Sequence, residues 1–164
     1  MNQASNQTTA PLKAKSVGRA ILEAPVHVSE VMTKDAMTLG PEQSFAEAVA
    51  LMANQSFHHV LVVDEEERLH GVVSDRDVLR ALARTPNWNN KTIGEIMATD
   101  PVTVTQDAPI SVALKAMLAA RINCLPVLGA DGRVCGILTS TDLLKAYEQV
   151  QLSIELSAAI NEPA

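Results

Sequence analysis

The chain has 164 residues, of which 47% are apolar and only 2% aromatic, so its core must be built from aliphatic side chains. A chain of this length can bury roughly 68–70% of its unfolded surface, as one domain or as two small domains that share a core. Its 13 Lys and Arg against 19 Asp and Glu give a net charge of −6, which argues against a basic surface that coats phosphates. The scarcity of aromatic side chains argues against base stacking, and we expect no nucleic-acid partner.

The apolar segments and the cysteines indicate the compartment. Every apolar run is far shorter than the ~20 residues that cross a bilayer, and the first residues lack the apolar core of a signal peptide. We therefore expect a cytoplasmic protein with no membrane partner. Cys124 and Cys135 have neither a CxxC spacing nor neighbouring histidines, so the sequence predicts reduced thiols and no metal site.

The sequence repeats itself after 65 residues. Residues 28–82 align without a gap on residues 93–147. The identical pairs include Met32 with Met97, Gly71 with Gly136 and Asp77 with Asp142. Because most other pairs exchange one aliphatic residue for another, the sequence predicts two copies of one structural unit.

Each copy predicts the same elements in the same order. A first strand is expected at residues 36–39 and again at 101–104. Apolar residues then recur at the spacing of one helical face. The two faces consist of Phe45, Ala48, Val49 and Met52, and of Ile110, Ala113, Leu114 and Met117. A β-hairpin follows in each copy, and a second helix begins near Ser74 and near Thr139. The sequence therefore predicts an α/β (α+β) fold of two strand-helix-strand-strand-helix repeats.

Composition also suggests where these units begin and end. The first residues are polar, and the segment RTPNWNNK between the copies breaks the apolar pattern. The predicted parts are a polar N-terminal tail at 1–24, a first domain at 25–84, a linker at 85–91, a second domain at 92–147 and a C-terminal helical extension at 148–164.

The end of each hairpin carries a repeated motif, at residues 71–77 and 136–142. Its pattern is Gly, two aliphatic residues, a hydroxyl residue, two variable residues and Asp. A strand that enters a helix through a hydroxyl residue presents free N–H groups to phosphate, and an Asp can accept both hydroxyls of a ribose. The same Ser-x-x-Asp or Thr-x-x-Asp spacing also suits a helix capping box with no ligand. On spacing alone both interpretations stay open.

Together these motifs resemble a tandem pair of cystathionine-β-synthase (CBS) domains, which is called a Bateman module. The resemblance rests on residues 28–33, 61–64 and 71–77 and, in the second copy, on 93–97, 125–128 and 136–142. It implies a pseudo-twofold pair of repeats with two clefts for adenosine-containing ligands such as AMP, ADP, ATP, NAD or S-adenosylmethionine.

The resemblance also implies which residues contact such a ligand. The hydroxyl residue of each motif would face phosphate and the Asp would hold the ribose, which assigns Ser74 with Asp77 and Thr139 with Asp142. Met37 and Val102 would line the base pocket. The residues that would border the clefts are Phe57, His58, Ile122 and Asn123. The candidates to neutralise phosphate are Arg76, Arg121 and Lys34.

The four histidines, at positions 27, 58, 59 and 70, offer no nucleophile with a base and no metal cluster, so we expect neither catalysis nor a required cofactor. The sequence predicts a regulatory module whose ligand is an adenine nucleotide, with AMP, ATP or NAD favoured. The resemblance further implies a homodimer and suggests an effector protein. The alternative is a ligand-free interaction module that dimerises and docks a partner through its C-terminal helix.

Overall fold

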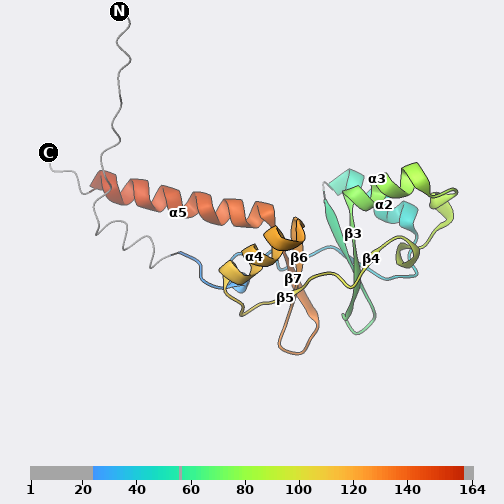
Figure 1. Cartoon of the computed structure of the whole chain (residues 1–164), viewed down its shortest axis with the longest axis horizontal. Coiled ribbons are helices and arrows are strands. Elements are labelled where there is room, and N and C mark those ends of the chain that lie inside the picture. The colour runs from blue at the N-terminus through green and yellow to red at the C-terminus, as the bar shows by residue number, and fades with distance from the viewer. Residues whose placement is uncertain (1–23, 56, 161–164) are drawn as a thin grey trace, which may run out of the picture. The chain divides into compact units, whose positions relative to one another are not determined.

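Each half of the chain folds into a short strand, a helix, a β-hairpin and a second helix. The computed structural model describes residues 24–55 and 57–160. The elements of the first half are β1 (Thr38–Leu39), α2 (Phe45–Gln55), β2 (His59–Val63), β3 (Leu69–Ser74) and α3 (Asp75–Arg84). Those of the second half are β5 (Val104–Thr105), α4 (Ile110–Ala120), β6 (Cys124–Leu128), β7 (Val134–Thr139) and α5 (Ser140–Ile160). The predicted α/β fold and the predicted order of elements are confirmed (Figure 1).

The two sheets follow the same plan. In each, the first strand pairs parallel with the next, which pairs antiparallel with the third. The hairpin register shifts between Val62 and Val63 in one sheet and between Val127 and Leu128 in the other, again 65 residues apart. The repeated register makes the two halves a pseudo-twofold pair.

The first strands are shorter than predicted, with two residues each. Residues 36–37 precede β1 because the chain is there crossing from one sheet to the other, after Thr33 has bridged to Ile137. Residues 101–103 precede β5 because Asp100 has a left-handed backbone (φ 51°) and Pro101 has no N–H to donate.

Each half also supplies backbone to the sheet of the other half. Strand β4 (Ala98–Thr99) follows α3 in sequence, yet it pairs antiparallel with β3 and completes a four-stranded sheet. The residue of the first half that is equivalent to Ala98 is Thr33, which bridges to Ile137 on β7. The sequence did not predict this exchange of edge strands, which ties the two repeats together through backbone hydrogen bonds.

Short 3-10 helices make the same exchange in the cores. Val28, in the 3-10 helix Val28–Glu30, is buried in the second core, and Ile93, in the 3-10 helix Ile93–Glu95, is buried in the first. Their N–H groups donate across the same boundary to the carbonyl oxygens of Ala108 and Gln43, at 3.0 and 2.9 Å. Neither core is therefore complete without residues of the other repeat.

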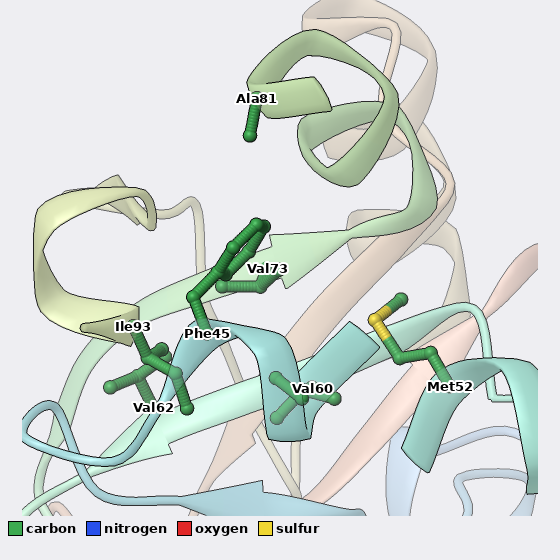
Figure 2. Packing of buried hydrophobic residues seen from close by; sticks show 8 residues of the cluster. Phe45, Met52, Val60, Val62, Val73, Ala81 and Ile93 are labelled. Carbon is green, nitrogen blue, oxygen red and sulfur yellow. The ribbon is translucent and has the colours of Figure 1, made fainter. Parts of the chain in front are cut away.

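Strand alternation divides the apolar residues between a helix-facing core and a sheet-facing layer. Val60, Val62 and Val73 point toward α2 and α3 and pack with Phe45 and Ala81, as Figure 2 shows. An equivalent core lies under α4 and contains Leu125, Val127 and Leu138. Both cores are mainly aliphatic, as the composition requires.

The predicted helical faces agree with the burial at most positions. Phe45, Ala48 and Met52 are buried on α2, and Ala113 and Met117 are buried on α4. The prediction is wrong at Leu114, which is 44% exposed because the narrow buried stripe of α4 passes through its neighbour Ala113.

The opposite faces of the two sheets meet. Leu61 and Val72 of the first sheet form one buried cluster with Cys124 and Ile137 of the second. This layer is where the repeats share apolar surface, and it places the ends of β3 and β7 near the boundary between them.

Residues 25–143 form one compact unit, and residues 144–160 of α5 belong to another. Apart from residue 24, the predicted N-terminal tail lies outside the described residues, as do residues 161–164 of the predicted extension. Among the described helices, none is long and apolar enough to cross a membrane.

Candidate functional site

Both repeated motifs form capping boxes. At the first, the Ser74 N–H and hydroxyl donate to Asp77 Oδ2 at 2.9 and 2.6 Å, and the Asp77 N–H donates to Ser74 Oγ at 3.3 Å. At the second, the Thr139 N–H and hydroxyl donate to Asp142 Oδ2 at 2.8 and 2.6 Å, and the Asp142 N–H donates to Thr139 Oγ1 at 3.3 Å. The hydrogen bonds of a capping box are therefore present at both motifs, and each carboxylate keeps a second oxygen for other donors.

The second oxygens have different partners. Arg80 Nη1 donates to Asp77 Oδ1 at 2.8 Å, and the Arg80 side chain is 57% exposed. The Thr33 hydroxyl donates to Asp142 Oδ1 at 3.2 Å. The first partner comes from the same helix and the second from the other repeat.

A cavity of ≈ 330 Å³ lies beside the first motif. That volume falls in the range of small-molecule sites. Its walls come from the end of β3 and the start of α3, from β4 and the residues after it, and from the segment between α4 and β6. We call this cavity the cleft. It lies at the boundary of the repeats because β4 brings the second half against β3.

The cleft brings together six of the predicted site residues. These are Ser74, Arg76, Asp77, Val102, Ile122 and Asn123. The other five do not line it: Met37, Phe57, His58, Thr139 and Asp142. Each of those five is 65 residues from a cleft residue, so they form the equivalent set at the second motif. Of these, Met37 packs against the first core, and His58 is exposed with its Nδ1 3.3 Å from Asp75 Oδ2.

The formal charges of the cleft belong to two arginines and three aspartates, and the aspartates are partly engaged. Asp77 accepts the capping bonds and Asp75 faces His58, whereas Asp100 also lines the cleft. Within residues 24–55 and 57–160, neither Arg76 nor Arg121 forms an ion pair. The cleft therefore presents two guanidinium groups that are available to an anion.

Two cleft residues have left-handed backbones that side chains rarely adopt. Arg121 ends α4 with φ 54°, at a helix terminus where Gly or Asn is usual, and Asp100 has φ 51°. Such a conformation costs roughly 1–2 kcal/mol for a residue with a Cβ. Strained residues of this kind are common at binding sites.

His59 and Cys124 are among the cleft-lining residues that sequence reasoning did not assign to the site. They are 65 residues apart and begin the middle strands of the two sheets. Burial lowers the pKa of His59 below its usual 6.5, with the nearby Asp75 opposing that effect. Burial also raises the pKa of the Cys124 thiol to about 11. Strand alternation could have found His59, since it lies on the same face of β2 as the sheet-facing Leu61.

In the part of the chain that the structure describes, no group of three or more His, Cys, Asp or Glu side chains could hold a metal ion. Hydroxyl, carboxylate and guanidinium groups around an apolar cavity instead suit a polar organic ligand.

A family model for the CBS domain matches residues 28–84 and 93–149. The chain thus belongs to the CBS domain family and contains two of these domains in tandem, as the resemblance implied.

Known proteins share the fold and part of the sequence. Inosine-5′-monophosphate dehydrogenase of Methanocaldococcus jannaschii is 32% identical over 130 residues, which are 79% of this chain and 25% of that enzyme. The chain likewise spans only about a quarter of the length of two other enzymes that it matches, L-aspartate semialdehyde sulfurtransferase and homoserine O-acetyltransferase.

Two similar crystal structures contain adenosine compounds. One is a CBS domain pair in complex with 5′-methylthioadenosine and S-adenosyl-L-methionine (30% identity, TM-score 0.67, 74% of this chain and 98% of that one). The other is CBSX2, a CBS-pair protein of Arabidopsis thaliana, in complex with AMP (27% identity, TM-score 0.69, 77% of this chain and 99% of that one).

Proposed function

We propose that this chain is a regulatory module without catalytic activity that binds an adenine nucleotide in the cleft. The observation that carries the proposal is the composition of the cleft at the repeat boundary. Its walls are partly apolar, and they include the carboxylate of the capping box and two arginines that form no ion pair with any described residue. The AMP complex of a similar CBS-pair protein supports the same class of ligand.

The ribose would bind at Asp77. Its Oδ2 is committed to the capping box, but its Oδ1 contacts the exposed Arg80 side chain, which can rotate away. A carboxylate with a free oxygen accepts hydroxyl hydrogens, and a charged acceptor makes these bonds stronger than neutral ones. The base would lie against the aliphatic side chains of Val72, Val102 and Ile122, because no Phe, Tyr or Trp lines the cleft among the residues that the structure describes.

The phosphate would bind at the start of α3. The positive end of the helix dipole lies there, and Arg76 and Arg121 add formal positive charge. These groups favour AMP, ADP, ATP or NAD over an uncharged nucleoside such as 5′-methylthioadenosine. Both guanidinium groups line the same cavity as three carboxylates, so they offer a phosphate two local cationic donors although the cleft as a whole is not positive.

A thermal-shift panel tests the proposal on the full chain with AMP, ATP, NAD, S-adenosylmethionine and, as a control for the base, GMP. A ligand at 100 times its dissociation constant adds about 2.7 kcal/mol to the free energy of unfolding. We expect a concentration-dependent rise in Tm with at least one adenine nucleotide and a smaller rise with GMP. No rise with any adenosine compound would refute the proposal and favour a ligand-free interaction module.

The exposed apolar residues favour a second role, self-association, which is compatible with ligand binding. Leu79 on α3 is 68% exposed and Leu82 is 44% exposed. The equivalent residues on α5, Leu144 and Tyr147, are 68% and 63% exposed. Apolar residues at matching positions of both repeats suit a homodimer. Light scattering should report twice the mass of one chain, and Leu79→Glu should shift it toward monomer; a monomer at high concentration would contradict this role.

A further inference from the structure

The two repeated motifs look alike in sequence, but their surroundings differ. Resting on the proposed function, we infer that the chain binds one nucleotide, at the first motif, whereas the second motif links the two repeats through Asp142 and Thr33.

The first observation is the partner of each carboxylate. The Asp142 residue is 9% exposed and its Oδ1 accepts from the Thr33 hydroxyl, 109 positions earlier in the chain. Thr33 is itself held in place, since its N–H and its carbonyl oxygen exchange two 2.9 Å bonds with Ile137. The Asp142 oxygen that a ribose would need thus already accepts from a group fixed on the backbone of the other repeat, and a ribose hydroxyl would have to compete with that donor.

The equivalent position at the first motif has no such group. Ala98 stands where the second motif has Thr33, and it too is paired with the sheet, at Val72. Alanine has no hydroxyl, so Asp77 turns its Oδ1 to Arg80 instead. Both aspartates are mostly buried, so access to solvent does not distinguish them. They differ in how firmly the donor to Oδ1 is held, because Arg80 is a flexible side chain whereas Thr33 is fixed by its backbone hydrogen bonds.

The second observation is the charge around each motif. The 65-residue alignment places Thr141 opposite Arg76 and Ser56 opposite Arg121, so neither cleft arginine is repeated. Lys34 stands opposite Thr99 and is the cation that the second motif gains in exchange. Ser140 stands at the position of Asp75, so the second motif has one cation and one carboxylate fewer, and it lacks the two guanidinium groups that can bind a phosphate through paired hydrogen bonds.

These two differences point the same way. At the first motif a ligand can displace a flexible side chain, and at the second it would have to break a contact between the repeats.

Isothermal titration of the full chain with AMP tests the inference, using the variants Asp77→Asn and Asp142→Asn. We expect one AMP per chain in the wild type, at least a tenfold rise in Kd with Asp77→Asn, and a Kd within about twofold of wild type with Asp142→Asn. Thr33→Val, which leaves both motifs intact, should also keep one AMP per chain.

Thermal stability tests the link between Thr33 and Asp142, on which ligand binding does not report. Thr33→Val and Asp142→Asn should each lower Tm, and the double variant should lose less than the sum of the two losses because they break the same bond. Additive losses would overturn the link between the repeats.

The remaining outcomes separate the inference from the function on which it rests. Two AMP per chain, or loss of binding in Asp142→Asn with retention in Asp77→Asn, would overturn the single site while leaving the proposed function intact. If the wild type binds neither AMP nor any other adenine nucleotide, the proposed function fails and the single site fails with it.

Discussion

A Cβ atom added at Gly71 would lie 2.7 Å from the carbonyl oxygen of Ala98. Ala98 belongs to β4, the strand that the second half adds to the first sheet. At Gly136 the corresponding distance, to the carbonyl oxygen of Thr33, is 2.6 Å. The glycine of the repeated motif is therefore required by the close passage of the other repeat's backbone, and the sequence interpretation of the motif as a ligand site does not explain it.

Gly71→Ala should destabilise the chain by about 1–3 kcal/mol, the usual cost of extra volume in a tightly packed place. Backbone atoms cannot yield as a side chain can, so β4 would have to move away from β3. Urea denaturation measures the loss. Gly40→Ala is the matched control, because its Cβ would meet only ordinary contacts at 3.7 Å or more and should change the free energy of unfolding little. Equal effects of the two substitutions would contradict this explanation.

The cleft arginines should matter for phosphate and not for the nucleoside. Arg76→Gln or Arg121→Gln removes one charge-assisted contact, worth about 1.5–3 kcal/mol, so the Kd for AMP should rise on the order of tenfold or more. The Kd for adenosine should change far less. Titration calorimetry with both ligands checks this, and Arg133→Gln, whose side chain faces Asp131 in the turn after β6, is the control. Equal losses for adenosine and AMP would assign the arginines a role in folding instead.

His59 should make the chain less stable in mild acid. Burial lowers the pKa of His59 in the folded chain below 6.5, so the unfolded chain binds the proton more readily. The stabilisation by neutral His59 is complete above about pH 6.5 and is lost as the pH falls through the lower, folded value. Urea midpoints at pH 7.5 and 5.5 should therefore differ for the wild type and differ less for His59→Gln. A difference between the two pH values that is as large in His59→Gln as in the wild type would contradict this explanation.

Cys124 should react slowly while the chain is folded. With its pKa raised to about 11, only about one thiol in a thousand is ionised at pH 8. In a Cys135→Ser background, alkylation of Cys124 by iodoacetamide should be at least about 100-fold slower in the native chain than in urea. Saturating AMP should slow it further, because Cys124 lines the cleft. Equal rates in the folded and unfolded chain would show that the thiol is not shielded.

Local patterns explain which parts of the fold could be predicted. The faces of α2 and α4 and both hairpins follow from apolar spacing, since each side chain reports its own burial. Strand β4 could not be predicted from such a pattern, because Ala98 and Thr99 are both exposed and two residues show no alternation. The exchange between the repeats depends on long-range pairing that no short window of sequence contains.

The candidate site was predictable to a similar degree. The motif spacing singled out Asp77 and Asp142 equally, because the residues that make them differ, Ala98 and Thr33, lie outside the motif. Asp100 was missed because its place in the cleft depends on a left-handed backbone that only the folded chain shows. The residues of a site are thus easier to predict from sequence than the neighbouring residues that determine whether their hydrogen-bonding atoms are open to a ligand.

The exchanged edge strands imply that one repeat cannot fold independently of the other. A polypeptide containing a single repeat would leave the outer edge of its hairpin unpaired and a hole in its core where Val28 or Ile93 belongs. Two such half-length polypeptides could satisfy each other only by assembling as a swapped dimer. The tandem chain is in this sense a dimer joined by a peptide linker, and joining the halves lets them diverge, so that one half can specialise in binding while the other maintains the assembly.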